Sequence, residues 1–159
     1  MSQVDLRQAL GGISGILVTP FDADDRIAPG RLRPILDRAL AAGLHVPVVN
    51  GNTGEFYALT VDEAEEMVGE VCSLVDGRAP VLAGIGRSVK EACRLAASAR
   101  AAGASGLMVH QPPDPFASPR GLVDYVERVA EAAEGLPLML YLRNDAIGTA
   151  AIARLCAIS

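Results

Sequence analysis

The sequence of 159 residues contains no tryptophan, only three tyrosines and three phenylalanines, and a single lysine, Lys90. No apolar run approaches the roughly 20 residues that a membrane-spanning helix needs. Residues 1–10 lack the basic and apolar segments of a signal peptide. Acidic residues outnumber basic ones by 19 to 14, and the basic residues form no cluster that would attract nucleic acid. We therefore expect a cytoplasmic protein that has neither nucleic acid nor a membrane as a partner.

The cysteines are few, odd in number and far apart, at Cys72, Cys93 and Cys156. A disulfide framework or a zinc site shows paired cysteines at short, regular spacing. We therefore predict no metal site. We expect the three thiols to be small buried hydrophobic groups in a reducing compartment.

A short pattern recurs four times: a helix end rich in small residues, then a glycine, then an apolar run. The four glycines lie 34, 26 and 32 residues apart, at Gly43, Gly77, Gly103 and Gly135. Glycine just past a helix end adopts the left-handed conformation at low cost. The spacing fits one strand, one loop and one crossover helix. The length suits a single domain over residues 1–159, with residues 1–11 as an N-terminal extension.

The predicted strands are almost continuously apolar. They cover residues 15–19, 46–49, 81–83, 107–109 and 138–140. Runs without alternation indicate burial on both faces, as in a parallel sheet covered by helices. Pro47 lies inside the second run and removes one backbone donor, which is unusual for a central strand.

The predicted helices carry start signals between these strands. Thr60 is followed by Glu63 and Ser88 by Glu91, which are two capping boxes. Ser118 precedes a proline, as at a helix N-cap. The first helix should begin near Arg31, because Pro34 is tolerated only in a first turn. A fifth helix is expected over residues 149–158. Alternating strands and helices predict a parallel α/β fold.

Two parallel folds fit this alternation. A doubly wound dinucleotide-binding fold places a Gly-x-Gly-x-x-Gly turn after the first strand. Residues 19–22 read Thr-Pro-Phe-Asp instead. We therefore predict part of a (β/α)8 TIM barrel. A whole barrel takes about 250 residues, and this chain supplies about five βα units.

Active sites of such barrels lie at the carboxyl ends of the strands. The candidates there are Thr19, Pro20, residues 50–55, residues 84–87, His110, Gln111 and residues 141–144. In residues 51–55, two glycines flank Asn52 and Thr53, and the turn with its hydroxyl suits a carboxylate. A plain strand-to-helix turn with Glu55 exposed fits equally well. Tyr141 could pass a proton, or be a core tyrosine whose hydroxyl reaches the rim.

Two segments resemble a known family. Residues 51–55, Gly-Asn-Thr-Gly-Glu, resemble the Gly-Thr-Thr-Gly-Glu signature of the dihydrodipicolinate synthase and N-acetylneuraminate lyase family. Residues 140–146, Leu-Tyr-Leu-Arg-Asn-Asp-Ala, are similar to the Tyr-Asn-Arg-Asp-Asn-Ala run of its 5-dehydro-4-deoxyglucarate dehydratases. Residues 19–21 also match the family's Thr-Pro-Phe. The resemblance spans residues 12–159. It implies a class I lyase that forms an imine between a lysine and a 2-keto acid. It implies no cofactor, because the imine is itself the electron sink.

The resemblance also implies roles for single residues. Thr53 would bind the carboxylate of the 2-keto acid, and Asn52 stands where the family has a proton-relaying threonine. Tyr141 would be the acid–base tyrosine. Arg143 would bind a substrate carboxylate, as a planar guanidinium can, although a solvated loop charge is an equal alternative. His110 could be a polar or acid–base group, or a histidine hydrogen-bonded at the barrel rim.

Departures from the family pattern indicate which of the family's activities this chain resembles. Residues 110–113 read His-Gln-Pro-Pro where dihydrodipicolinate synthases have paired tyrosines, which favours a sugar-acid dehydratase or aldolase. The family's lysine lies on a sixth strand, which this chain does not include. Lys90 sits in the first turn of a predicted helix, where it should be solvated and unable to act as that nucleophile. His45 precedes the second strand and should be structural.

Three interpretations follow from these departures. The chain is a lyase-family member truncated before its lysine and inactive alone. Alternatively, it is a non-catalytic half-barrel or assembly module, which would pair as a homo-oligomer or with a complementary C-terminal half, because an open sheet leaves two bare edges. It could also be a truncated gene product whose other half is encoded elsewhere.

Overall fold

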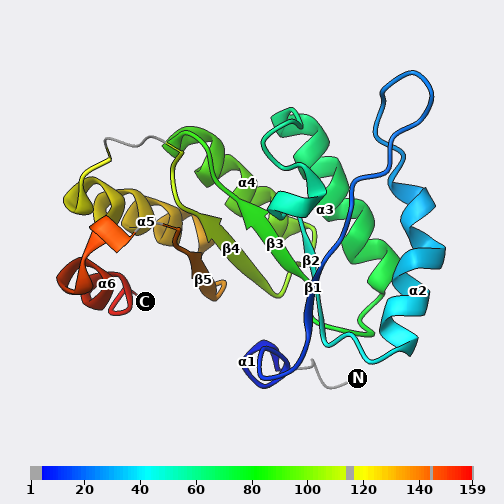
Figure 1. Cartoon of the computed structure of the whole chain (residues 1–159), viewed down its shortest axis with the longest axis horizontal. Helices are drawn as coiled ribbons and strands as arrows, with labels where there is room; N and C mark the ends of the chain where they lie inside the picture. Colours follow the sequence, from blue (N-terminus) through cyan, green and yellow to red (C-terminus); the bar gives the residue numbers. More distant parts are fainter. Residues whose placement is uncertain (1–4, 114–116, 144, 159) are drawn as a thin grey trace.

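In the computed structural model, residues 5–113, 117–143 and 145–158 are described. Five parallel strands form one sheet in the order β1-β2-β3-β4-β5 (Figure 1). They are β1 (Ser14–Ile16), β2 (Val46–Val49), β3 (Leu82–Ile85), β4 (Gly106–His110) and β5 (Leu138–Tyr141). A doubly wound sheet reverses its strand order at a switch point. The unbroken order instead gives the arc of a barrel, as the sequence predicts.

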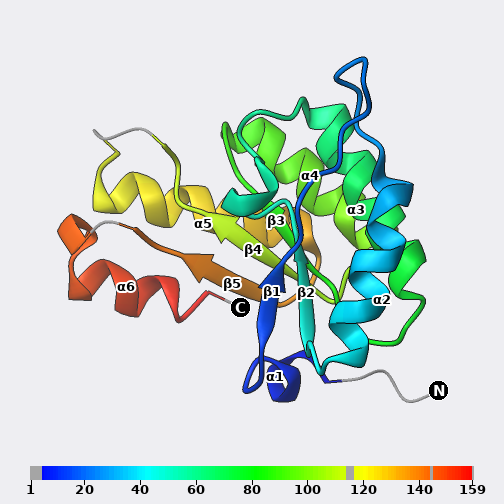
Figure 2. The same cartoon turned by 45° about the vertical axis from the view of Figure 1, so that its right-hand side comes forward.

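One helix follows each strand, and these helices cover one face of the sheet (Figures 1 and 2). They are α2 (Arg33–Ala41), α3 (Val61–Val75), α4 (Val89–Ala101), α5 (Pro119–Ala133) and α6 (Thr149–Leu155). Shorter elements are the helix α1 (Leu6–Ala9) and the 3-10 turns η1 (Pro29–Leu32), η2 (Asn52–Gly54) and η3 (Asp145–Ile147). No helix in the described ranges is both long enough and apolar enough to cross a membrane.

The local signals in the sequence are confirmed. Both capping boxes form, at the starts of α3 and α4, and Ser118 caps α5 by accepting from the Gly121 amide at 3.1 Å. Pro34 falls in the first turn of α2, directly after η1. All four helix-terminating glycines have positive φ, between 71° and 94°.

The main core lies between the sheet and its helices. Alternate strand residues such as Val49, Ile85 and Leu107 pack there against α3, α4 and α5. A smaller cluster covers the inner face, where Val48 and Met108 meet Leu6 of α1. Helix α1 lies at the foot of Figure 1, below the amino ends of the strands. The described part of the expected N-terminal extension is therefore packed into the fold.

Pro47 is accommodated by the way β2 pairs. The amide of Val46 points to β1, donating to Ile13 at 3.1 Å. The backbone nitrogens of successive residues in a strand point to opposite neighbouring strands, so the nitrogen of Pro47 faces β3. Pairing with β3 begins only at Val48. The missing donor therefore removes no bond from the sheet.

Some expected boundaries and burials were wrong. Strand β1 ends at Ile16 instead of Thr19, and α6 ends at Leu155, three residues earlier than expected. Cys156 is exposed just past the end of α6, and the other two thiols are only half-buried. The sequence placed all three cysteines within helices, which is right for Cys72 and Cys93 only, and it did not indicate the solvent exposure of each position. Burial raises the pKa of Cys72 to about 11.

Candidate functional site

The carboxyl ends of the strands bring the predicted site residues to one end of the molecule. This end is uppermost in Figure 1, opposite α1. His110 closes β4 and pairs in register with Tyr141, which closes β5. The loop that carries Asn52 and Thr53 follows β2 at the same end.

The start of this loop is fixed by a close backbone crossing. Asn50 has a left-handed backbone with φ 59°, and its carbonyl oxygen would lie 2.1 Å from a Cβ at Gly84. Only glycine allows this approach. The Asn50 side chain donates to the Ala64 carbonyl of α3 at 2.8 Å. Nε2 of His110 lies 3.0 Å from the Asn50 carbonyl oxygen.

The middle of the loop is held against β1. The Thr19 hydroxyl donates to the Gly54 carbonyl at 2.6 Å, and a Cβ at Gly54 would stand 2.7 Å from the Leu17 carbonyl oxygen. The side chains of Asn52 and Thr53 are exposed and hydrogen-bond to no described residue. Their loop is therefore anchored by its glycine while these two side chains remain open to a ligand.

His110 forms the floor of the site. Its side chain is fully buried. The ring stacks on Phe56 with centroids 4.9 Å apart and meets the rings of Tyr57 and Tyr141 edge-on, each at 5.7 Å. Burial lowers the pKa of His110, and the charge of Arg143 lowers it further. The hydrogen bond to the Asn50 carbonyl raises the pKa but does not offset the burial, so the pKa lies below its usual value. The ring is therefore neutral near pH 7, and its Nδ1 has no partner among the described residues.

Tyr141 and Arg143 form the open rim on the β5 side. Tyr141 is 39% exposed, and the Arg143 guanidinium carbon lies 6.0 Å from the centre of its ring. The Arg143 amide donates to the Gln111 side chain at 2.9 Å, while the Gln111 amide donates to the Tyr141 carbonyl at 3.2 Å. These bonds fix the backbone that presents both side chains. Asn144, the last candidate on this strand end, lies outside the described residues.

Arg87 lies just after β3, at the same end of the sheet, and the sequence indicated no role for it. It has φ 74° and donates through its guanidinium to the carbonyls of Phe56 and Leu59. The guanidinium carbon lies 4.8 Å above the Phe56 ring, a cation–π contact. Arg87 thus ties the loop after β2 to the end of β3. Its place at a strand end made it one of the sequence candidates, but the sequence did not indicate these contacts.

Tyr57 was also missed, because it lies just beyond the segment that resembles the family signature. It contacts Phe56 and His110 edge-on, yet 40% of its surface is exposed. Burial raises its pKa, and the charges of Arg143 and Arg87 partly oppose this. The phenol is therefore a neutral hydrogen-bond donor near pH 7.

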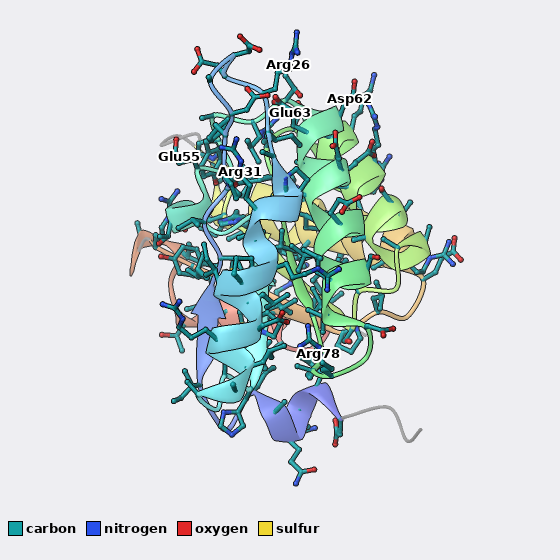
Figure 3. The ribbon with its side chains drawn as sticks, turned by 90° about the vertical axis from the view of Figure 1, so that its right-hand side faces the viewer. Arg26, Arg31, Glu55, Asp62, Glu63 and Arg78 are labelled. Carbon is teal, nitrogen blue, oxygen red and sulfur yellow. The ribbon has the colours of Figure 1, made fainter. Side chains whose placement is uncertain are left out.

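Other charged residues lie at both ends of the molecule. Figure 3 places Glu55 at the upper, site end with Arg31 and Glu63, and Arg78 at the opposite end. Lys90 is exposed in the first turn of α4. His45 accepts a hydrogen bond from the Ile13 amide at 3.0 Å before β2, and so is structural. In the described ranges, no three His, Cys, Asp or Glu side chains are grouped as a metal site would require.

Comparison with known proteins decides the family. Residues 9–159 match the profile of the dihydrodipicolinate synthetase family. The chain belongs to this family. Within it, the chain is 37% identical over 131 residues to a 4-hydroxy-tetrahydrodipicolinate synthase of Salinibacter ruber, covering 82% of this chain and 43% of that protein. It is 32% identical to a probable 5-dehydro-4-deoxyglucarate dehydratase of Rhizobium rhizogenes, covering 98% and 51% respectively.

A solved member of the family has the same fold. The crystal structure of dihydrodipicolinate synthase from Bacillus clausii superposes with a TM-score of 0.88 at 38% identity, covering 95% of this chain and 51% of that one. The chain therefore spans about half the length of the relatives it matches. Its five strands correspond to part of the dihydrodipicolinate synthetase family's TIM barrel.

Proposed function

We propose that the chain supplies the 2-keto-acid-binding part of a class I Schiff-base lyase of the sugar-acid dehydratase or aldolase type. The observation that carries this proposal is that Tyr141 meets the buried ring of His110 at the carboxyl end of the sheet, with Arg143 next to it and the loop that carries Thr53 at the same end. The reactive lysine would come from polypeptide beyond these 159 residues.

Each residue has a physical task in this proposal. The exposed Thr53 hydroxyl binds the carboxylate, and Asn52 can donate an amide hydrogen beside it. Tyr141 transfers a proton between substrate and amine. Arg143 binds a second carboxylate or a hydroxyl farther along the substrate. His110 is buried, so its contribution is to hold the Asn50 carbonyl and the two flanking rings in place.

Trapping the imine tests the proposal. The chain is incubated with pyruvate and borohydride, alone and together with the part of the B. clausii enzyme that it does not cover, and masses of the intact chains are measured. We expect no adduct on the chain alone and an adduct on the added segment. The T53V variant should reduce trapping, while Lys90→Arg should leave it unchanged. An adduct on Lys90 would contradict the proposal.

A second candidate function is supported by the apolar edge of the sheet. Ile13, Ile16 and Val18 on and around β1 are 62%, 42% and 43% exposed, and Ile16 pairs with inner-face Val48. We propose as the alternative that the chain is an assembly module that pairs with a copy of itself or with a complementary C-terminal half. Light scattering after size-exclusion chromatography tests this, and a stable monomer that stays soluble would count against it.

A further inference from the structure

Tyr57 occupies a position that packing alone does not account for. Its neighbour Phe56 is fully buried, whereas 40% of Tyr57 is exposed. One side of the Tyr57 ring is well packed, since its centroid lies 5.1 Å from that of Phe56 and 5.7 Å from that of His110. The ring is therefore held on one side by Phe56 and His110, while 40% of the residue remains exposed.

Tyr57 and Tyr141 approach the same histidine in the same manner. Both rings meet His110 edge-on, at interplanar angles of 64° and 82° and with centroids 5.7 Å away in each case. They come from different elements: one from the loop after β2 and one from the end of β5. Tyr57 also shares its loop with Thr53. The Tyr57 ring therefore lies at the end of the sheet where Thr53 and Tyr141 would hold a ligand.

The charges around Tyr57 favour an oxygen-rich or anionic group. Arg143 and Arg87 both lie near enough for their charges to act on its phenol. Neither guanidinium forms an ion pair with a carboxylate in the described part of the chain. Arg78 at the opposite end is different, because it pairs with Asp37 at 2.7 Å. A neutral phenol beside a guanidinium that has no carboxylate partner can donate to hydroxyl or carboxylate oxygens.

We infer that Tyr57 is a specificity-determining residue whose phenol hydrogen-bonds to the substrate chain beyond the 2-keto group. This inference rests on the proposed function and deepens it. Pyruvate has no polar atom beyond its keto carbon, so it cannot make this contact. A longer 2-keto acid with hydroxyl groups can. Tyr57 would therefore separate hydroxylated sugar acids from short keto acids.

The test compares the affinities of two probes by NMR titration of the 159-residue chain. The probes are pyruvate and 2-keto-3-deoxygluconate, which has hydroxyls beyond the keto group. We expect the wild-type chain to bind the longer acid more tightly than pyruvate. Y57F should reduce this preference about three- to tenfold, the effect of one neutral hydrogen bond, and leave pyruvate affinity unchanged.

The outcomes separate the two proposals. If both acids bind and Y57F keeps the wild-type ratio, the inference about Tyr57 is wrong while the proposed function stands. If Y57F weakens both acids equally, the phenol serves the loop and not specificity, which also overturns the inference. If the wild-type chain binds neither acid, the proposed function fails and the inference fails with it.

Discussion

His110 donates a hydrogen bond through Nε2 to the Asn50 carbonyl oxygen, 3.0 Å away and fully buried. A carbonyl oxygen can only accept, so Nε2 carries the proton and Nδ1 does not when the ring is neutral. This one bond joins the end of β4 to the start of the loop that carries Thr53.

Replacing this histidine should loosen the loop. His110→Phe keeps an aromatic ring against Phe56 but leaves the Asn50 carbonyl unpaired. A buried unpaired acceptor costs about 1–3 kcal/mol, and we expect a loss of that size in the free energy of unfolding in urea. Replacing His45 by phenylalanine, at the other end of the barrel, removes an exposed bond from the Ile13 backbone amide. It should leave ligand binding unchanged, whereas binding by His110→Phe should weaken.

The same residue predicts a pH dependence. Because the His110 pKa is lower in the folded state, the unfolded state binds a proton more readily, with a pKa near 6.5. The histidine therefore contributes full stability above about pH 6.5 and loses it as the pH falls toward the folded pKa. The free energies of unfolding of wild type and His110→Phe, measured from pH 8 to pH 5, should converge at low pH. A constant difference would contradict this assignment.

Arg87 predicts a local effect on the loop after β2. Arg87→Ala removes donors to the Phe56 and Leu59 carbonyls and the cation on the Phe56 ring. We expect a loss of about 1–3 kcal/mol in unfolding free energy and faster amide hydrogen exchange in residues 52–58. Arg120→Ala is the control, since Arg120 is 86% exposed and, among the described residues, makes only a long ion pair with Asp124. Equal exchange in the two variants would show that Arg87 does not fix the loop.

Replacing Gly54 or Gly69 by alanine should change the stability of the protein in opposite directions. In Gly54→Ala the added Cβ would meet the Leu17 carbonyl oxygen at 2.7 Å, so the loop must shift, and we expect at least about 2 kcal/mol of destabilisation. Gly69 lies within α3 and has nothing within 4 Å of an added Cβ. Gly69→Ala should stabilise the protein by about 0.5–1 kcal/mol, because alanine favours the helix. Thermal unfolding of the two variants measures both effects.

The cysteines should differ in reactivity. Cys156 is exposed, whereas burial raises the pKa of Cys72 to about 11 and leaves little reactive thiolate near pH 8. A chromogenic disulfide reagent should therefore modify Cys156 first and Cys72 much more slowly. In Cys156→Ser the fast phase should disappear. A fast phase that persists at full amplitude would contradict the exposure of this thiol.

The fold could be read from the sequence because its signals are local. Apolar runs, the capping boxes at Thr60 and Ser88, and the four helix-terminating glycines each act within a few residues. The end of β1 could not be predicted this way, because Val18 is apolar but leaves the ladder where the loop after β2 packs on Leu17. The exposure of Cys156 likewise depends on tertiary packing around the end of α6, which the local sequence does not indicate.

The candidate site could be placed at the strand ends from the sequence, but the contacts within it could not be predicted. Tyr141 and His110 are neighbours because β4 and β5 pair in register. The roles of Arg87 and Tyr57 arise from contacts between residues about 30 or more positions apart, and no spacing rule in the sequence indicates them. The stacking of Phe56 on His110 has the same origin.

The central claim is that a 2-keto acid binds through its carboxylate at Thr53, between the loop after β2 and the end of β5. The most direct measurement is a titration of the isotope-labelled chain with pyruvate, followed by backbone amide NMR shifts. We predict saturable shifts confined to residues 51–57, 110–111 and 141–143, and their loss in T53V. Shifts centred on Lys90 or on α1, or shifts that T53V leaves intact, would contradict the claim.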